Sequence, residues 1–79
     1  MKLKQASIKN VARQEIHTRV AQKTRGRIEG LQVEIVKDTV ILTGSTSTYY
    51  SKQLATEAVR AVEFHLGLSN EIQVHSTTA

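Results

Sequence analysis

The chain has 79 residues, no cysteine and no proline, and its 11 Lys and Arg residues outnumber its 7 Asp and Glu residues. A chain of this size forms one domain with a small hydrophobic core, which leaves little room for a deep, dry active site. Without cysteine, a disulfide framework and a thiolate metal site are both excluded.

The basic residues are concentrated at the start of the chain. Residues 1–27 hold eight Lys and Arg against one Glu, a net charge of +7. Residues 28–79 hold three basic against six acidic residues, a net charge of −3. This asymmetry indicates a basic arm or face that could meet an anionic partner, although a solvated helix surface would give the same pattern.

The first predicted element is an amphipathic helix from about Ser7 to Lys23, because apolar residues recur there every four positions. Ser7 is the expected N-cap, and Glu15 and Arg19 have the i, i+4 spacing of a favourable ion pair. Residues 1–6 are expected to form a loose tail. The apolar stripe comprises Ile8, Ala12, Ile16 and Val20, with Val11 beside it.

A loop over residues 24–30 leads to two predicted strands. Alternation of apolar and polar residues from Leu31 to Lys37 is typical of a half-buried strand, and the β-branched run from Thr39 to Thr43 predicts a second. The Lys37-Asp38 pair between them predicts a two-residue hairpin turn, in which Asp tolerates the required positive φ better than most residues.

The second half predicts a polar break, a helix and one more strand. Residues 44–48 form the break, and Ser47 or Thr48 is the expected N-cap of a helix that ends near Glu63. Its apolar face is expected to hold Tyr50, Leu54, Ala58, Ala61 and Val62, widened by Ala55 and Val59. Residues 68–74 alternate as a third strand, and residues 76–79 are a tail.

These elements predict an α+β fold: a single small domain of order α-β-β-α-β. The strand–helix–strand half should place the last strand parallel to the second. The result is a three-stranded mixed sheet with two helices packed on one face, and the other face left open.

The residues carry no recognisable catalytic or cofactor-binding pattern. His17, His65 and His75 are not spaced as converging metal ligands, and no glycine-rich phosphate loop follows a strand. Residues 44–47 do not form a nucleophile elbow. No catalytic residue, metal or cofactor is therefore predicted, and an enzyme is the weakest interpretation.

Three segments with consistent order and spacing resemble the BON domain, a small bacterial module of osmotically inducible, nodulation and cell-envelope proteins. They are the strand pair ending in Leu42-Thr43-Gly44, the Ala-rich helix of residues 47–62, and the closing strand of residues 67–74. The likeness covers roughly residues 8–75. The chain departs from the family pattern at Asp38, where glycine is usual, and at residues 63–65, where Pro-Gly-Val is common.

This resemblance implies a non-catalytic binding module that associates with phospholipid or other envelope polymers. Together with the basic segment, it leads us to expect association with an anionic surface, most simply phospholipid headgroups. The candidate contact residues are Lys9, Arg13, Lys23, Arg25 and Arg27. As the chain stands, the expected location is cytoplasmic or peripheral to a membrane, and the cell envelope or periplasm if it is a fragment.

Two other functions stay open. The first is a protein–protein interaction or assembly module that uses the open sheet face or an edge strand, as a monomer or weak homo-oligomer. The second is nucleic-acid binding through the same basic segment, which ranks lower because KH-type and RRM-type motifs are missing.

Overall fold

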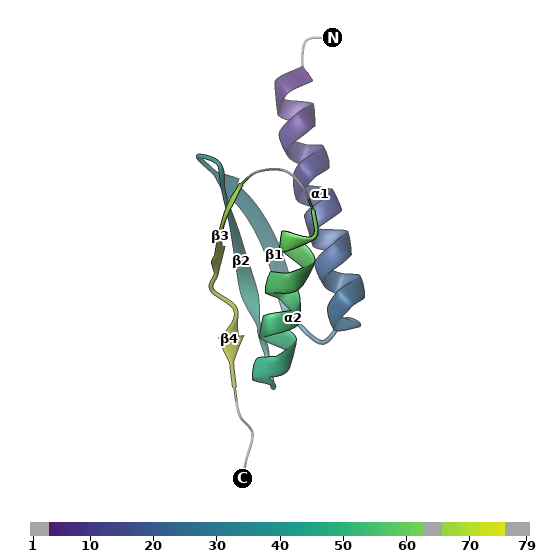
Figure 1. The fold of residues 1–79 in the computed structure, drawn as a ribbon, viewed down its shortest axis with the longest axis vertical. Helices are drawn as coiled ribbons and strands as arrows, with labels where there is room; N and C mark the ends of the chain where they lie inside the picture. The colour runs from purple at the N-terminus through teal and green to yellow at the C-terminus, as the bar shows by residue number, and fades with distance from the viewer. Residues whose placement is uncertain (1–3, 63–65, 76–79) are drawn as a thin grey trace.

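The computed structural model describes residues 4–62 and 66–75 and forms a two-layer α+β domain (Figure 1). Helix α1 is followed by a β-hairpin, by helix α2 and by two short strands, so the predicted α-β-β-α-β order is confirmed, with the last strand divided in two. The elements are α1 (Lys4–Thr24), β1 (Glu29–Val36), β2 (Thr39–Thr46), α2 (Tyr49–Arg60), β3 (Gly67–Asn70) and β4 (Gln73–Val74).

Helix α1 packs through the predicted stripe, of which Ala12, Ile16 and Val20 are buried. Val11 is 62% exposed, because neighbouring residues of an α-helix point about 100° apart and Val11 is turned away from the stripe. The predicted ion pair is present, with Arg19 Nε 2.8 Å from Glu15 Oε2. The predicted N-cap at Ser7 is wrong, since α1 already includes residues 4–6, which were expected to be a tail.

Strands β1 and β2 form the predicted hairpin, with Val36 opposite Thr39. Lys37 and Asp38 both have positive φ, at 49° and 65°, as a two-residue turn of this kind requires. The predicted alternation holds: Val33, Val40 and Leu42 are buried, whereas Gln32 and Glu34 are exposed on the opposite face.

The predicted break after Thr43 is wrong for residues 44–46, because β2 continues through Gly44 to Thr46. Opposite Gly44, β1 contains one extra residue, a β-bulge at Gly30 and Leu31 that restores the pairing of Glu29 with Ser45. The β-branched threonines favour extended backbone, and β4 pairs with the end of β2, so this polar stretch stays in the sheet.

Helix α2 begins after Thr48, whose hydroxyl accepts a hydrogen bond from the Ser51 amide. The helix ends at Arg60, three residues before the predicted end. Its buried residues are Ser51, Ala55, Ala58 and Val59. The buried face is therefore turned about the helix axis from the predicted one, toward Ala55 and Val59. Small residues on the buried side let α2 lie close to α1 and to the sheet, and Tyr50, which was expected there, is 66% exposed.

Strands β3 and β4 run parallel to β2, as predicted for the closing strand. They are separated at Glu71 and Ile72, where the Glu71 amide donates to the Leu42 carbonyl and the Ile72 side chain is 1% exposed. The single predicted strand of residues 68–74 is therefore interrupted so that Ile72 can enter the core.

Both helices cover one face of the sheet, but they are offset from each other along the strands (Figure 1). The first turns of α1 project past the sheet at the hairpin end, while α2 begins at the opposite end (Figure 1). Neither helix of the described residues is long and apolar enough to cross a lipid bilayer. The core between the layers comprises Ile16, Val20, Ile28, Val33, Val40, Leu42, Ala55, Ala58, Val59 and Ile72.

Candidate functional site: a basic pocket

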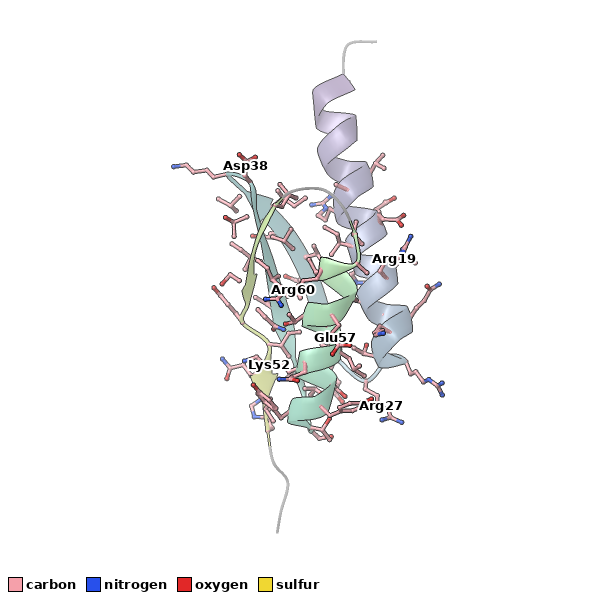
Figure 2. The ribbon with its side chains drawn as sticks, viewed as in Figure 1. Arg19, Arg27, Asp38, Lys52, Glu57 and Arg60 are labelled. Carbon is pink, nitrogen blue, oxygen red and sulfur yellow. The ribbon has the colours of Figure 1, made fainter. Side chains whose placement is uncertain are left out.

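Three of the five predicted contact residues lie together at the end of α1. Lys23, Arg25 and Arg27 line one pocket of about 350 Å³, which we call the basic pocket. Thr24 from α1 and Tyr50 and Leu54 from α2 complete its lining. Figure 2 shows Arg27 at the end of the molecule where α2 begins, far from the hairpin turn at Asp38.

The chain turns sharply at this pocket because α1 ends in a Schellman motif. The Arg25 amide donates to the Gln22 carbonyl at 3.2 Å, and the Gly26 amide donates to the Ala21 carbonyl at 3.0 Å. The buried Thr24 hydroxyl donates to the Val20 carbonyl at 2.8 Å and holds the last turn. This ending reverses the chain and sets Arg25 and Arg27 on the same rim as Lys23.

Arg25 stands where a helix of this type usually has glycine. Its φ is 55°, in the left-handed region that costs a residue with a Cβ about 1–2 kcal/mol. An exposed cation therefore occupies a position that disfavours it conformationally. Backbone strain of this kind is concentrated at functional sites, which marks Arg25 as a candidate binding residue.

The charge of the basic pocket is poorly neutralised. Lys23 Nζ lies 4.0 Å from Glu57 Oε1, and both side chains are about half exposed, so this ion pair is weak. Within the described ranges, Arg25 and Arg27 form no ion pair at all. The first turn of α2 adds the positive end of a helix dipole beside Tyr50. The pocket is thus electropositive.

Two exposed tyrosines stand at this end of the molecule. Tyr49 and Tyr50, which open α2, are 63% and 66% exposed, although Tyr50 was expected on the apolar face of the helix. Tyr50 thus adds an aromatic ring and a hydroxyl to the cations.

The other two predicted contact residues lie elsewhere. Arg13 lines a separate pocket with Gln14 and His17, beside strand β1. Lys9 belongs to α1 one turn before Arg13, and its side chain is outside the described residues. The five residues therefore do not form one surface.

The basic pocket offers cations together with the hydroxyl and the aromatic ring of Tyr50, which suit reversible binding of an anion. In the part of the chain that the structure describes, no three His, Asp or Glu residues lie close enough together to hold a metal ion. His17 and His75 line different pockets, and His65 with Phe64 lies outside the described residues.

Comparison with known proteins finds no matching family model, no matching curated protein and no matching solved structure. The resemblance to BON domains therefore stays a prediction based on the residue pattern.

Proposed function

We propose that this protein is a non-catalytic module that binds reversibly to anionic phospholipid surfaces through the basic pocket. One observation carries the proposal: Lys23, Arg25 and Arg27 converge beside the exposed ring of Tyr50, and two of the three cations have no acidic partner in residues 4–62 and 66–75. The two earlier basic residues, Lys9 and Arg13, are not needed for this interaction.

The chemistry of the pocket suits a lipid headgroup layer. Basic residues near an anionic leaflet contribute about 1 kcal/mol each, so three give useful but reversible attraction. Tyrosine rings favour the membrane–water interface because they combine an apolar body with a polar tip. Tyr50 lies beside the cations, so one surface could use both effects.

The likeness to BON domains supports the same proposal independently, since that family is associated with envelope membranes. The strands and the second helix that carry the likeness build the scaffold, while the basic residues lie mostly before them. In this proposal the protein is a peripheral membrane component that needs no cofactor or metal.

Replacing Arg27 with glutamine is expected to weaken binding to anionic vesicles about fivefold, which corresponds to the loss of about 1 kcal/mol. Co-sedimentation with phosphatidylcholine vesicles of rising phosphatidylserine content measures the effect. Binding by the unmodified protein should rise with the anionic lipid and fall as salt is added, because ions screen exposed charges.

Arg19→Gln is the matched control, since it removes the same charge from an exposed position of α1 where Arg19 is already paired with Glu15. It should leave vesicle binding almost unchanged. Equal binding to neutral and anionic vesicles would contradict the proposal. Binding to nucleic acid at low salt without binding to vesicles would replace it with the alternative based on the same charges.

Replacing Arg25 with glycine is expected to separate stability from binding. Glycine adopts the φ of 55° without strain, so the free energy of unfolding should rise by about 1 kcal/mol. Vesicle affinity should fall about fivefold, because one cation is lost. Urea unfolding and vesicle co-sedimentation measure the two effects, and a variant that gains stability with undiminished vesicle affinity would exclude Arg25 from the contact surface.

A further inference from the structure

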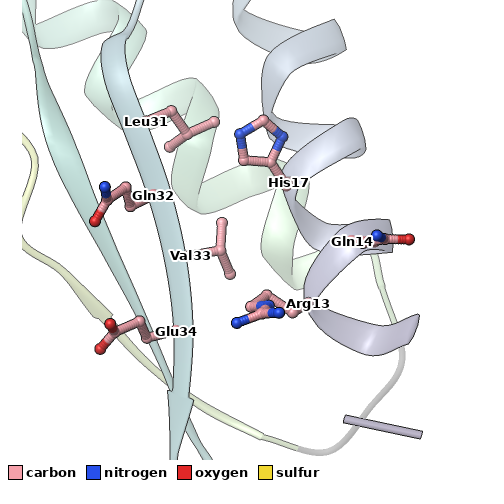
Figure 3. Close-up of a pocket in the computed structure, with 7 residues that line it drawn as sticks. All are labelled: Arg13, Gln14, His17, Leu31, Gln32, Val33 and Glu34. Atoms are coloured by element: carbon pink, nitrogen blue, oxygen red, sulfur yellow. The ribbon is translucent and has the colours of Figure 1, made fainter. Parts of the chain in front are cut away.

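A second pocket, of about 320 Å³, lies between α1 and strand β1 (Figure 3). We call it the edge groove; its lining is Arg13, Gln14 and His17 from α1 and the four consecutive residues Leu31–Glu34 from β1. In Figure 3, Leu31 and Val33 point toward α1, whereas Gln32 and Glu34 point to the other face of the sheet. A pocket lined by residues from both faces of one strand must lie across the edge of that strand.

The edge of β1 in this groove is unpaired within the described residues. Strand β1 pairs with β2 on one side and is the first strand of the sheet order. It is eight residues long, which is enough to pair with another extended segment. Free strand edges of this length accept an added strand through main-chain hydrogen bonds.

The register indicates which main-chain groups face the groove. The Leu42 carbonyl of β2 accepts from the Glu71 amide, so Leu42 directs its hydrogen bonds away from β1. Val33, opposite Leu42, therefore directs its amide and carbonyl outward, and so does Ile35, two residues along the strand. These two residues offer four hydrogen-bonding groups in the spacing of a partner strand.

The α1 wall of the groove is basic and polar. Arg13 and His17 lie one turn apart on α1, and both line the groove. The acidic residue of the lining, Glu34, points to the opposite face of the sheet (Figure 3). On the helix side, an incoming chain would meet the Arg13 side chain.

We propose that the edge groove binds an extended peptide carrying acidic side chains, which adds to the sheet as a strand beside β1. Its main chain pairs with Val33 and Ile35, and its acidic side chains on the helix side meet Arg13. A second copy of this chain fits less well, because edge-to-edge pairing would bring the Arg13 residues of two copies to the same face of the joined sheet. The groove is separate from the basic pocket, so this proposal does not depend on vesicle binding.

The probe is a fluorescent seven-residue peptide of alternating glutamate and valine, capped at both ends and measured by fluorescence anisotropy. Two further peptides carry N-methyl groups on the amides of one edge or of the other, and a fourth has lysine in place of glutamate. One N-methylated peptide should bind at least about tenfold more weakly while the other binds normally, since an added strand uses a single edge. The lysine peptide should not bind detectably.

Arg13→Gln should weaken binding of the acidic peptide about fivefold, while the matched control Arg19→Gln should not, with circular dichroism confirming that both variants fold. In NMR spectra of the complex, the amides of Val33 and Ile35 should shift and exchange more slowly with solvent. Absence of peptide binding, an equal loss for both N-methylated peptides, or shifts confined to the basic pocket would overturn the proposal. Light scattering that shows a concentration-dependent dimer paired through β1 would assign the edge to a second copy instead.

Discussion

Replacing Gly44 with alanine is expected to lower the free energy of unfolding by about 3 kcal/mol, the largest effect of any change considered for this chain. A Cβ at this position would lie 2.9 Å from the Glu29 carbonyl oxygen and 2.9 Å from Ile28 Cγ2. The backbone φ of 143° is also one that L-residues rarely adopt. Urea unfolding followed by circular dichroism measures the loss, which corresponds to a drop in Tm of roughly 15 °C.

Gly30→Ala is the control, because Gly30 lies across the same bulge with a φ of 64° and nothing within 4 Å of the added methyl group. The free energy of unfolding of this variant should fall by only about 1 kcal/mol, the cost of placing a residue with a Cβ at positive φ. If the two variants were equally stable, close packing of β1 on Gly44 would not be what restricts this position to glycine.

The sequence pattern predicts most of the scaffold because local signals and tertiary packing agree there. The stripe of α1, the alternation of β1 and the turn at Lys37-Asp38 each follow from periods of 3.6 or 2 or from positive φ. The parallel closing strand follows from the need for a crossover connection. Apart from the closing strand, these features depend on neighbours in the chain.

The predictions that were wrong concern segments whose conformation is set by packing against distant parts of the chain rather than by their own residue pattern. The polar run after Thr43 resembles a loop, yet it stays extended because β4 pairs with it. The buried face of α2 is set by how closely α1 and the sheet approach it, which favours Ser51 and Ala55 over the large ring of Tyr50. Neither fact can be read from a period, since each depends on a partner distant in the chain.

The candidate site shows the same limit. Lys23, Arg25 and Arg27 fall within five residues, so their proximity follows from the chain itself. Arg13 is ten residues before Lys23 on one helix, which places it about 15 Å away along the axis. Their shared positive charge suggested a single contact surface. In the structure, Lys23, Arg25 and Arg27 line the basic pocket, whereas Arg13 lines the edge groove.

Replacing Asn70 with alanine is expected to lower the free energy of unfolding by about 2–3 kcal/mol. Its side-chain amide donates to the Lys52 carbonyl at 2.9 Å and to Thr56 Oγ1 at 2.8 Å, and its carbonyl accepts from the Ile72 amide at 3.1 Å. One side chain thus joins α2 to the point where β3 ends and Ile72 enters the core. Chemical unfolding followed by circular dichroism measures the change.

Ser69→Ala is the matched control, because the neighbouring Ser69 hydroxyl also makes a side-chain hydrogen bond, to Glu71 Oε2 at 2.9 Å, but on the exposed surface. Exposed hydrogen bonds exchange with water, so this variant should stay within about 0.5 kcal/mol of the unmodified protein. The contrast tests whether the interruption of the closing strand depends on the Asn70 bonds to α2. A loss at Asn70 no larger than that at Ser69 would show that pairing with β2 and the burial of Ile72 hold β3 and β4 in place without the Asn70 bonds.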